Sequence, residues 1–239
     1  MPHVWEIHPF GADLPEECIF IQEGSCCALY SVYCEMPAYE QALADHTPIA
    51  LEYQKGVMQY LQALEPGKRW LLKAPGHMFT WNEFLMAFPD AQIYVNHRDP
   101  GKAIPSLASL FLALRELHSV DAIDPHALGQ AQLAMWGAAL NGYARWRAGS
   151  GQDAQVFDVE YTKLVGAPMQ TVEELYDRFK LPLTASARGA MERHLDRDHH
   201  GKGPKRRYTL AQFGITEEMI EDTFGDYIDQ FDVTRETRL

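Results

Sequence analysis

Two short segments of the chain combine residue types that can bind an anion and move a proton. Residues 73–77 hold a lysine and a histidine four positions apart, and a second segment places Ser106 eight positions after Arg98. A guanidinium and a hydroxyl can close together on one phosphate. The imidazole of His77 can take a proton from a hydroxyl near neutral pH, and Lys73 can neutralise charge on a group in transfer.

Each segment, taken separately, also has an ordinary structural explanation. Arg98 could pair with the neighbouring Asp99, while Ser106 packs on a helix. His77 could cap a helix, with Lys73 left in solvent. The chemistry therefore depends on whether the fold gives these side chains a common site.

Short apolar runs alternate with helical patterns along the chain. Three such runs predict buried strands: residues 70–72, 93–95 and 156–159. Strands that alternate with helices predict an α/β fold in which a parallel sheet is covered on both faces. We expect a single domain over residues 1–239, in which residues 1–45 wrap irregularly around a core formed by residues 46–239.

The ends of the predicted strands gather the polar candidates. Lys73, Arg98 and Glu160 would each leave a strand at the carboxyl edge of the sheet, where ligands bind in folds of this class. Asp99 and Pro100 suit the N-cap and first position of a following helix, whose free N–H groups would add to an anion site.

Bulk composition excludes several classes of partner. The formal net charge of the 239 residues is −12, which disfavours broad contact with nucleic acid or with an anionic membrane. There is no run of 18 apolar residues, and the first ten residues lack the pattern of a signal peptide, so we expect a cytoplasmic protein. Cations cluster in residues 201–207, which contain no acid.

The two segments together resemble the bacterial sulfotransferase family that uses 3′-phosphoadenosine 5′-phosphosulfate (PAPS). The sequences that carry the resemblance are LLKAPGH (71–77), FPDAQIYVNHRDP (88–100) and PSLASL (105–110). Outlying elements agree with it: IHPFGADLPEEC (7–18), VEYTKL (159–164), RRYTL (206–210) and FGI (213–215). The resemblance covers nearly the whole chain. It implies a three-layer α/β/α fold of the P-loop NTPase kind.

The resemblance also implies catalytic roles. His77 would be the general base that takes the proton of an acceptor hydroxyl or amine, and Lys73 would stabilise the sulfuryl group in flight. Such a transfer requires positioning, charge stabilisation and one base, so no metal is expected. The acceptor would be a small molecule whose identity the sequence does not indicate.

The nucleotide would be held by five residues according to the same resemblance. Arg98 and Ser106 would bind the 3′-phosphate, and Tyr161 would lie near the adenine. The basic cluster would cover the 3′-phosphate, with Lys202 and Arg207 as the chosen contacts.

One element of the family pattern is missing from this sequence. The family begins with a strand and a phosphate loop of the type RSGTT, and the nearest stretch here, residues 67–69, lacks the required serine or threonine. Three explanations are open: the chain is a fragment or the product of a mis-called gene start, a partner chain supplies the missing part, or the chain is an inactive homologue that keeps only the 3′-phosphate site or the fold. An incomplete sheet would expose an edge, which favours pairing with a second copy or with a chain that supplies the missing part.

Two rival interpretations are weaker. The triplet His97-Arg98-Asp99 resembles a protein-kinase catalytic loop, but Ile104 stands where that loop needs asparagine. Histidines and aspartates crowd residues 194–200 without the separated spacing of a metal site, so a solvated loop is favoured.

The four cysteines show no C-x-x-C spacing and are expected to be reduced and mostly buried.

Overall fold

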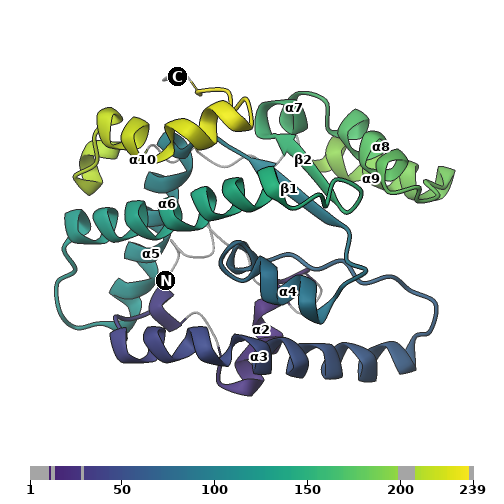
Figure 1. The fold of residues 1–239 in the computed structure, drawn as a ribbon, viewed down its shortest axis with the longest axis horizontal. Helices are drawn as coiled ribbons and strands as arrows, with labels where there is room; N and C mark the ends of the chain where they lie inside the picture. Colours follow the sequence, from purple (N-terminus) through teal and green to yellow (C-terminus); the bar gives the residue numbers. More distant parts are fainter. Residues whose placement is uncertain (1–10, 12–13, 28–29, 199–207, 237–239) are drawn as a thin grey trace. The chain divides into compact units, whose positions relative to one another are not determined.

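The computed structural model describes residues 11, 14–27, 30–198 and 208–236, and Figure 1 shows their helices and strands. The chain forms two compact units, Met1–Ala91 with Leu110–Ile123 and Gln92–Ser109 with Asp124–Leu239. The helix α5 (Pro100–His118) contributes residues to both units. The single domain expected over residues 1–239 stays a prediction.

The described part of the first unit consists of helices joined by loops. Its elements are α2 (Ile19–Gln22), the 3-10 helices η1 (Glu23–Ser25) and η2 (Tyr30–Val32), α3 (Pro37–Leu64), the 3-10 helix η3 (Pro75–Phe79) and α4 (Trp81–Ala87). α3 packs against α2, η1 and α4. Leu51, Gln54 and Met58, which recur on one face of α3, are buried.

Two sequence predictions in this unit were wrong. α3 begins at Pro37, within the segment expected to be irregular, because proline suits the first turn of a helix as well as it breaks an interior one. Residues 70–72 form no strand, and Leu71 is 94% exposed. Three apolar residues are too few to show a period, and no strand pairs with them in the described part of the chain.

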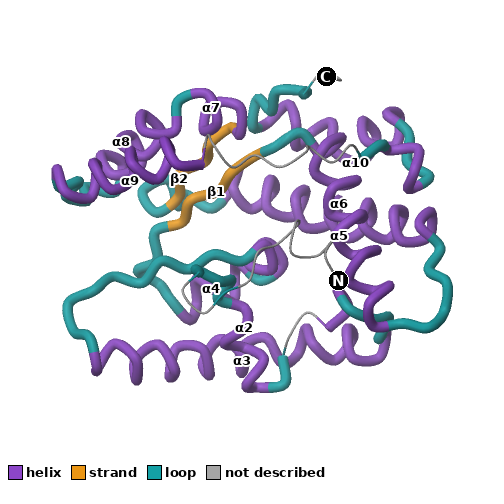
Figure 2. Tube along the Cα trace, turned by 180° about the vertical axis from the view of Figure 1, so that it is seen from behind, coloured by secondary structure: helices purple, strands orange, loops and turns teal. Residues whose placement is uncertain are grey.

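The second unit contains the sheet. β1 (Ile93–His97) and β2 (Val156–Glu160) pair in parallel with Ile93 opposite Val156 and His97 opposite Glu160. Figure 2 shows the two strands side by side in orange. Two of the three predicted strands are therefore confirmed, and the described residues form a helix-rich α/β protein with a two-stranded parallel sheet.

Helices account for most of the second unit. Besides the start of α5 they are α6 (Pro125–Gly149), α7 (Tyr161–Gly166), α8 (Pro168–Arg178), α9 (Ala185–Asp198), the 3-10 helix η4 (Leu210–Phe213) and α10 (Glu217–Gln230). α6 packs against both η4 and α10. Trp136, Tyr143 and Phe224 are buried, which places the core of this unit along α6 and α10.

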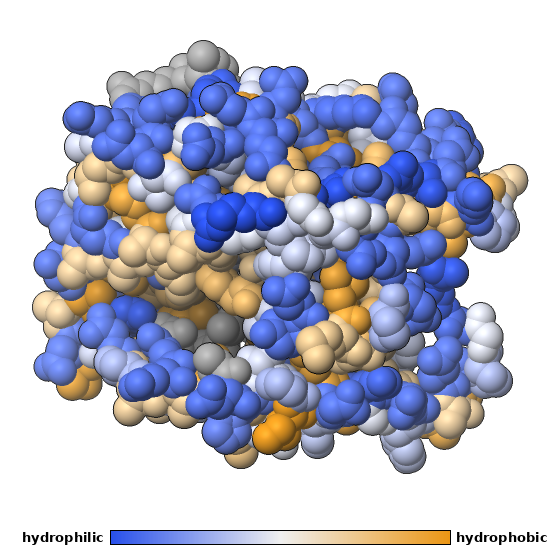
Figure 3. Space-filling model, in the orientation of Figure 1, coloured by the Kyte–Doolittle hydropathy of each residue, from blue (hydrophilic) through white to orange (hydrophobic). Residues whose placement is uncertain are grey.

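Hydrophilic residues predominate on the face of the molecule drawn in Figure 3, in keeping with the net charge of −12. Among the described residues no helix combines the length and the apolar character that crossing a membrane requires.

Candidate functional site

Arg98 lies where β1 meets α5. β1 ends at His97 and α5 begins at Pro100, so Arg98 leaves the sheet at its carboxyl edge. Asp99 caps the helix as predicted, since its Oδ1 accepts a hydrogen bond of 2.9 Å from the backbone N–H of Gly101.

The guanidinium of Arg98 contacts two side chains. Its Nε donates to Oε1 of Glu236 at 2.7 Å, and its Nη2 donates to Oε2 at 3.1 Å. The Arg98 Cζ also lies 4.3 Å from the centre of the Tyr161 ring. The hydrogen bonds to Glu236 raise the pKa of Arg98 above its ordinary value. Arg98 therefore holds a planar oxyanion with two parallel hydrogen bonds, the geometry that also suits phosphate.

The segment that carries Glu236 is held in place by Asp99. The backbone N–H of Glu236 donates to Asp99 Oδ2 at 2.8 Å, and Arg235 Nε lies 3.0 Å from Asp99 Oδ1. Arg235 also pairs with Glu217 at 3.0 Å and Glu221 at 3.1 Å, both on α10. Asp99 thus holds in place the C-terminal segment whose Glu236 carboxylate contacts Arg98.

A buried polar network anchors the end of β1. His97 is 1% exposed, with Nε2 2.9 Å from Asp158 Oδ1 and Nδ1 2.7 Å from the hydroxyl of Tyr227. The same carboxylate accepts from the Tyr143 hydroxyl at 2.5 Å and from Arg147 Nε at 2.8 Å.

Burial alone would raise the pKa of Asp158, but hydrogen bonds from His97, Tyr143 and Arg147 bring it to about 2. An ionised carboxylate only accepts hydrogen bonds, so Nε2 of His97 carries the hydrogen. The network ties β1, β2, α6 and α10 together directly before Arg98.

The other residues predicted to bind the nucleotide differ in what the structure shows of them. Tyr161 opens α7 and lies against Arg98, so these two predicted residues meet. Ser106 is half-buried in the second turn of α5. Lys202 and Arg207 lie outside the described residues, and their roles stay predictions.

His77 lies in the first unit, on η3. Its Nε2 is 3.0 Å from the Sγ of Cys18, and its ring centre is 4.6 Å from that of Phe84. Burial lowers the pKa of His77 from 6.5 to about 4. At neutral pH the ring is therefore uncharged and able to accept a proton.

Lys73 does not follow a strand and lies in an exposed loop, with 69% of its side chain accessible. Its Nζ pairs with Glu17 Oε1 at 2.5 Å, and its backbone carbonyl accepts from the backbone N–H of Cys18 at 3.1 Å.

Cys18 and Cys27 are buried while Cys26 and Cys34 are exposed, so the expectation of mostly buried thiols holds for half of the four.

The predicted site residues form two groups. Lys73, in the loop before η3, and His77, on η3, belong to the first unit, whereas Arg98, Ser106 and Tyr161 belong to the second. The convergence of the two groups on one ligand stays a prediction. Glu236 and Cys18 were missed because contacts across 138 and 59 positions leave no periodic signal in the sequence.

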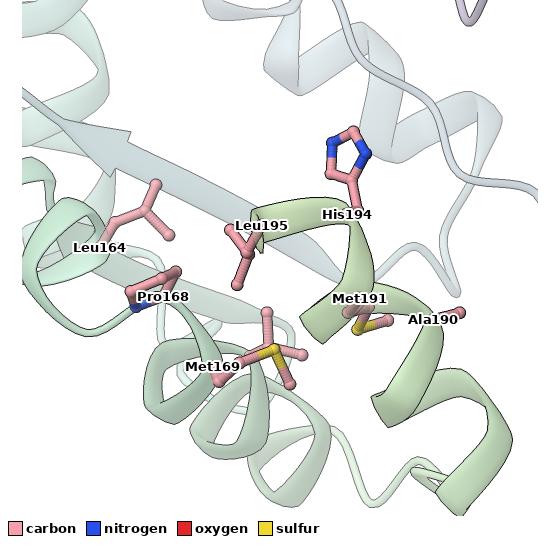
Figure 4. A pocket seen from close by; sticks show the side chains of 8 residues that line it. Leu164, Pro168, Met169, Ala190, Met191, His194 and Leu195 are labelled. Atoms are coloured by element: carbon pink, nitrogen blue, oxygen red, sulfur yellow. The ribbon is translucent and has the colours of Figure 1, made fainter. Parts of the chain in front are cut away.

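A separate apolar pocket of about 450 Å³ lies among α7, α8 and α9. Figure 4 shows the side chains of Leu164, Pro168, Met169, Met191 and Leu195 around it. Of the predicted catalytic and nucleotide-binding residues that the structure describes, none lines it. In the described part of the chain no group of three or more histidine, cysteine, aspartate or glutamate residues is arranged to hold a metal ion.

The chain belongs to the sulfotransferase family, whose sequence model matches residues 1–185. The crystal structure of sulfotransferase STF9 from Mycobacterium avium is similar, with 29% identity and a TM-score of 0.85 over 97% of this chain and 60% of that one. Sulfotransferase STF1 from Mycobacterium tuberculosis H37Rv gives 29% identity and a TM-score of 0.76 over 91% of this chain and 56% of that one. The chain thus spans less than two thirds of either neighbour. None of the curated proteins compared with the chain matches it. The family and the α/β fold class predicted from the sequence are confirmed.

Proposed function

We propose that this chain is a sulfotransferase that moves a sulfuryl group from PAPS to a hydroxyl or amine of a small acceptor. The observation that carries the proposal is the bidentate contact of Arg98 with a carboxylate, at the edge where β1 leads into α5. A nucleotide phosphate presents the same pair of oxygens, and free N–H groups of a helix N-terminus favour its charge. Membership of the sulfotransferase family supplies the reaction class.

In the proposed reaction His77 takes the proton of the acceptor. A new bond forms between the acceptor oxygen or nitrogen and sulfur, while the bond from sulfur to the bridging oxygen of the donor breaks. Adenosine 3′,5′-bisphosphate leaves with the electrons of that bond. The low pKa of His77 keeps the ring in its proton-accepting form, and an anionic donor nearby would raise that pKa towards the value a base needs.

The nucleotide is assigned to the second unit. Arg98 and Ser106 would bind its 3′-phosphate, and Tyr161, which already stacks on the guanidinium, would lie beside the adenine. Lys202 and Arg207 would add charge from their basic cluster. Lys73 would compensate charge on the sulfuryl group, provided that the exposed ion pair with Glu17 opens.

A second candidate is a homologue that binds no donor or transfers no group. The observation that favours it is that Arg98 and Lys73, two predicted partners of the donor's negative charge, are each paired with a carboxylate in this structure. Such a protein would keep the fold without displacing these carboxylates.

Transfer of radiolabelled sulfate from PAPS to a panel of alcohols, phenols, amines and sugars decides between the two. We expect label in at least one acceptor, and we expect His77→Gln to abolish transfer while binding of adenosine 3′,5′-bisphosphate persists. His46→Gln, which changes an exposed histidine of α3, is the matched control and should transfer normally. Absence of transfer by the wild-type chain under all conditions, or full activity of His77→Gln, contradicts the proposal.

A further inference from the structure

Two consecutive residues far upstream contact both predicted catalytic side chains. Glu17 pairs with Lys73, and Cys18 lies with its Sγ 3.0 Å from Nε2 of His77. The backbone N–H of Cys18 also donates to the carbonyl of Lys73 at 3.1 Å. Residues 17–18 are therefore joined to residues 73–77 by one backbone contact and two side-chain contacts.

The two side-chain contacts differ in weight. The ion pair between Glu17 and Lys73 is exposed, and pairs of this kind contribute little. Cys18 is 7% exposed and His77 is half-buried, so solvent competes far less for the contact between thiol and imidazole. A thiol this close to a ring nitrogen favours the ring orientation that keeps this contact.

Protonation states set the direction of this hydrogen bond. Burial raises the pKa of the Cys18 thiol, and burial lowers that of His77, so both groups are uncharged at neutral pH. A thiol is a weak donor and a weaker acceptor, whereas the lone pair of a neutral imidazole accepts well. The favoured arrangement has S–H donating to Nε2, which leaves the ring hydrogen on Nδ1.

We propose that Cys18 is a positioning residue, which holds the ring of His77 in the tautomer whose lone pair on Nε2 receives the proton of the acceptor. The acceptor hydroxyl or amine then replaces the thiol as the donor to Nε2, with the ring already aligned. This inference rests on the proposed function, because it assigns Cys18 a task only if His77 is the base. Among the described residues, Glu17 and Lys73 are the charged groups on the two segments that carry the pair.

The tautomer can be measured without any enzymatic assay. In the 15N-labelled full chain, long-range proton–nitrogen correlation spectra distinguish a protonated ring nitrogen from an unprotonated one, and His77→Gln assigns the signals. We expect Nδ1 protonated and Nε2 unprotonated in the wild type. Cys18→Ala should shift both signals towards a mixture of tautomers and raise the pKa of His77, because the donor to the neutral ring is lost. Cys18→Ser retains a donor and should keep the wild-type tautomer.

Cys27→Ala is the matched control. Cys27 is also buried in the first unit, but its thiol donates to the backbone carbonyl of His46 at 3.8 Å and, among the described residues, contacts no imidazole nitrogen. We expect kcat to fall roughly tenfold in Cys18→Ala with little change in KM, as for a misaligned base, and to recover in Cys18→Ser. Cys27→Ala should keep the wild-type tautomer and kcat.

An unchanged tautomer and pKa of His77 in Cys18→Ala would overturn the proposal, and so would a tautomer shift that leaves kcat intact. Equal shifts in Cys18→Ala and Cys27→Ala would show a general loosening of the unit and would overturn it too. Failure of the proposed function is recognised separately, by full transfer activity in His77→Gln.

Discussion

At the carboxyl end of β1, one side chain is both the predicted phosphate ligand and the partner of an internal carboxylate. Arg98 binds Glu236 through two nitrogens while its face rests on Tyr161. Both carboxyl and guanidinium groups are partly exposed, so the pair is only modestly stabilising and a doubly charged phosphate can compete with it. If the nucleotide binds as proposed, Glu236 weakens that binding by the free energy needed to release Arg98.

Replacing this carboxylate should therefore strengthen binding. We expect Glu236→Gln to raise the affinity for adenosine 3′,5′-bisphosphate about two- to fivefold, which corresponds to an ion pair of up to about 1 kcal/mol. Calorimetric titration measures the change. Glu221→Gln is the control, because Glu221 pairs with Arg235 of the same segment, whereas Arg98 pairs with Glu236. An affinity equal to or lower than that of the wild type would show that Glu236 does not compete with the nucleotide.

His77 should make the folded chain sensitive to acid. The pKa of His77 is about 4 in the folded chain, whereas an ordinary histidine, as in the unfolded chain, has a pKa of 6.5. Between pH 4 and pH 6.5 the unfolded chain therefore binds a proton that the folded chain does not. The free energy of unfolding contributed by this residue therefore falls as the pH falls from 6.5 to 4, by up to about 3 kcal/mol.

Denaturant titrations of the wild type and of His77→Gln between pH 4 and pH 7.5 test this expectation. The wild type should lose stability relative to the variant across that window. Parallel pH profiles of the two proteins would mean that His77 is not held in its neutral form by burial.

At the scale of the elements, two glycines of α6 differ in how closely other atoms approach them. A Cβ on Gly129 would lie 2.2 Å from the carbonyl oxygen of Phe213 on η4, whereas a Cβ on Gly142 would meet nothing within 4 Å. Gly129 thus permits the close packing of α6 on η4, and Gly142 has no such role.

Alanine substitutions should separate these two roles. Gly129→Ala should lower the free energy of unfolding by about 1–3 kcal/mol, because backbone atoms must move apart. Gly142→Ala should raise it by about 0.5–1 kcal/mol, because alanine favours a helix interior. Chemical denaturation measures both, and a stabilised Gly129→Ala variant would refute the packing of α6 on η4.

The elements also show what the sequence could predict. β1 and β2 were found because their apolar runs end in clear breaks, at Arg98-Asp99-Pro100 and at Glu160. The run at 70–72 was mistaken for a strand because three apolar residues fit a strand or a loop equally well. Residues 37–45 were expected to be irregular, although Pro37 occupies the first turn of α3.

The site could be predicted only in part, for a geometric reason. The pairing of His97 with Glu160 sets the register of the parallel strands, so the next residues, Arg98 and Tyr161, leave the sheet together. The family resemblance named both residues, but their contact follows from register, which the sequence does not state. Cys18 contacts His77 and Glu236 contacts Arg98 across 59 and 138 positions, so both could be found only in the structure.

At the scale of the whole molecule, the predicted catalytic pair and the predicted nucleotide ligands belong to different compact units. The chain also spans 60% and 56% of its two structural neighbours. Family membership and fold class are established by the comparisons. The donor, the acceptor and the general base are proposals, and a binding experiment tests the first of them.

The most direct test is calorimetric titration of the 239-residue chain with adenosine 3′,5′-bisphosphate and with 5′-AMP, repeated on Arg98→Ala. We predict that the wild type binds the bisphosphate more tightly, and that Arg98→Ala weakens this binding by about 2 kcal/mol or more, as for a lost charged hydrogen bond, while 5′-AMP is unaffected. Equal affinity for the two nucleotides, or no binding by the folded chain, would contradict the assignment of a 3′-phosphate site to Arg98.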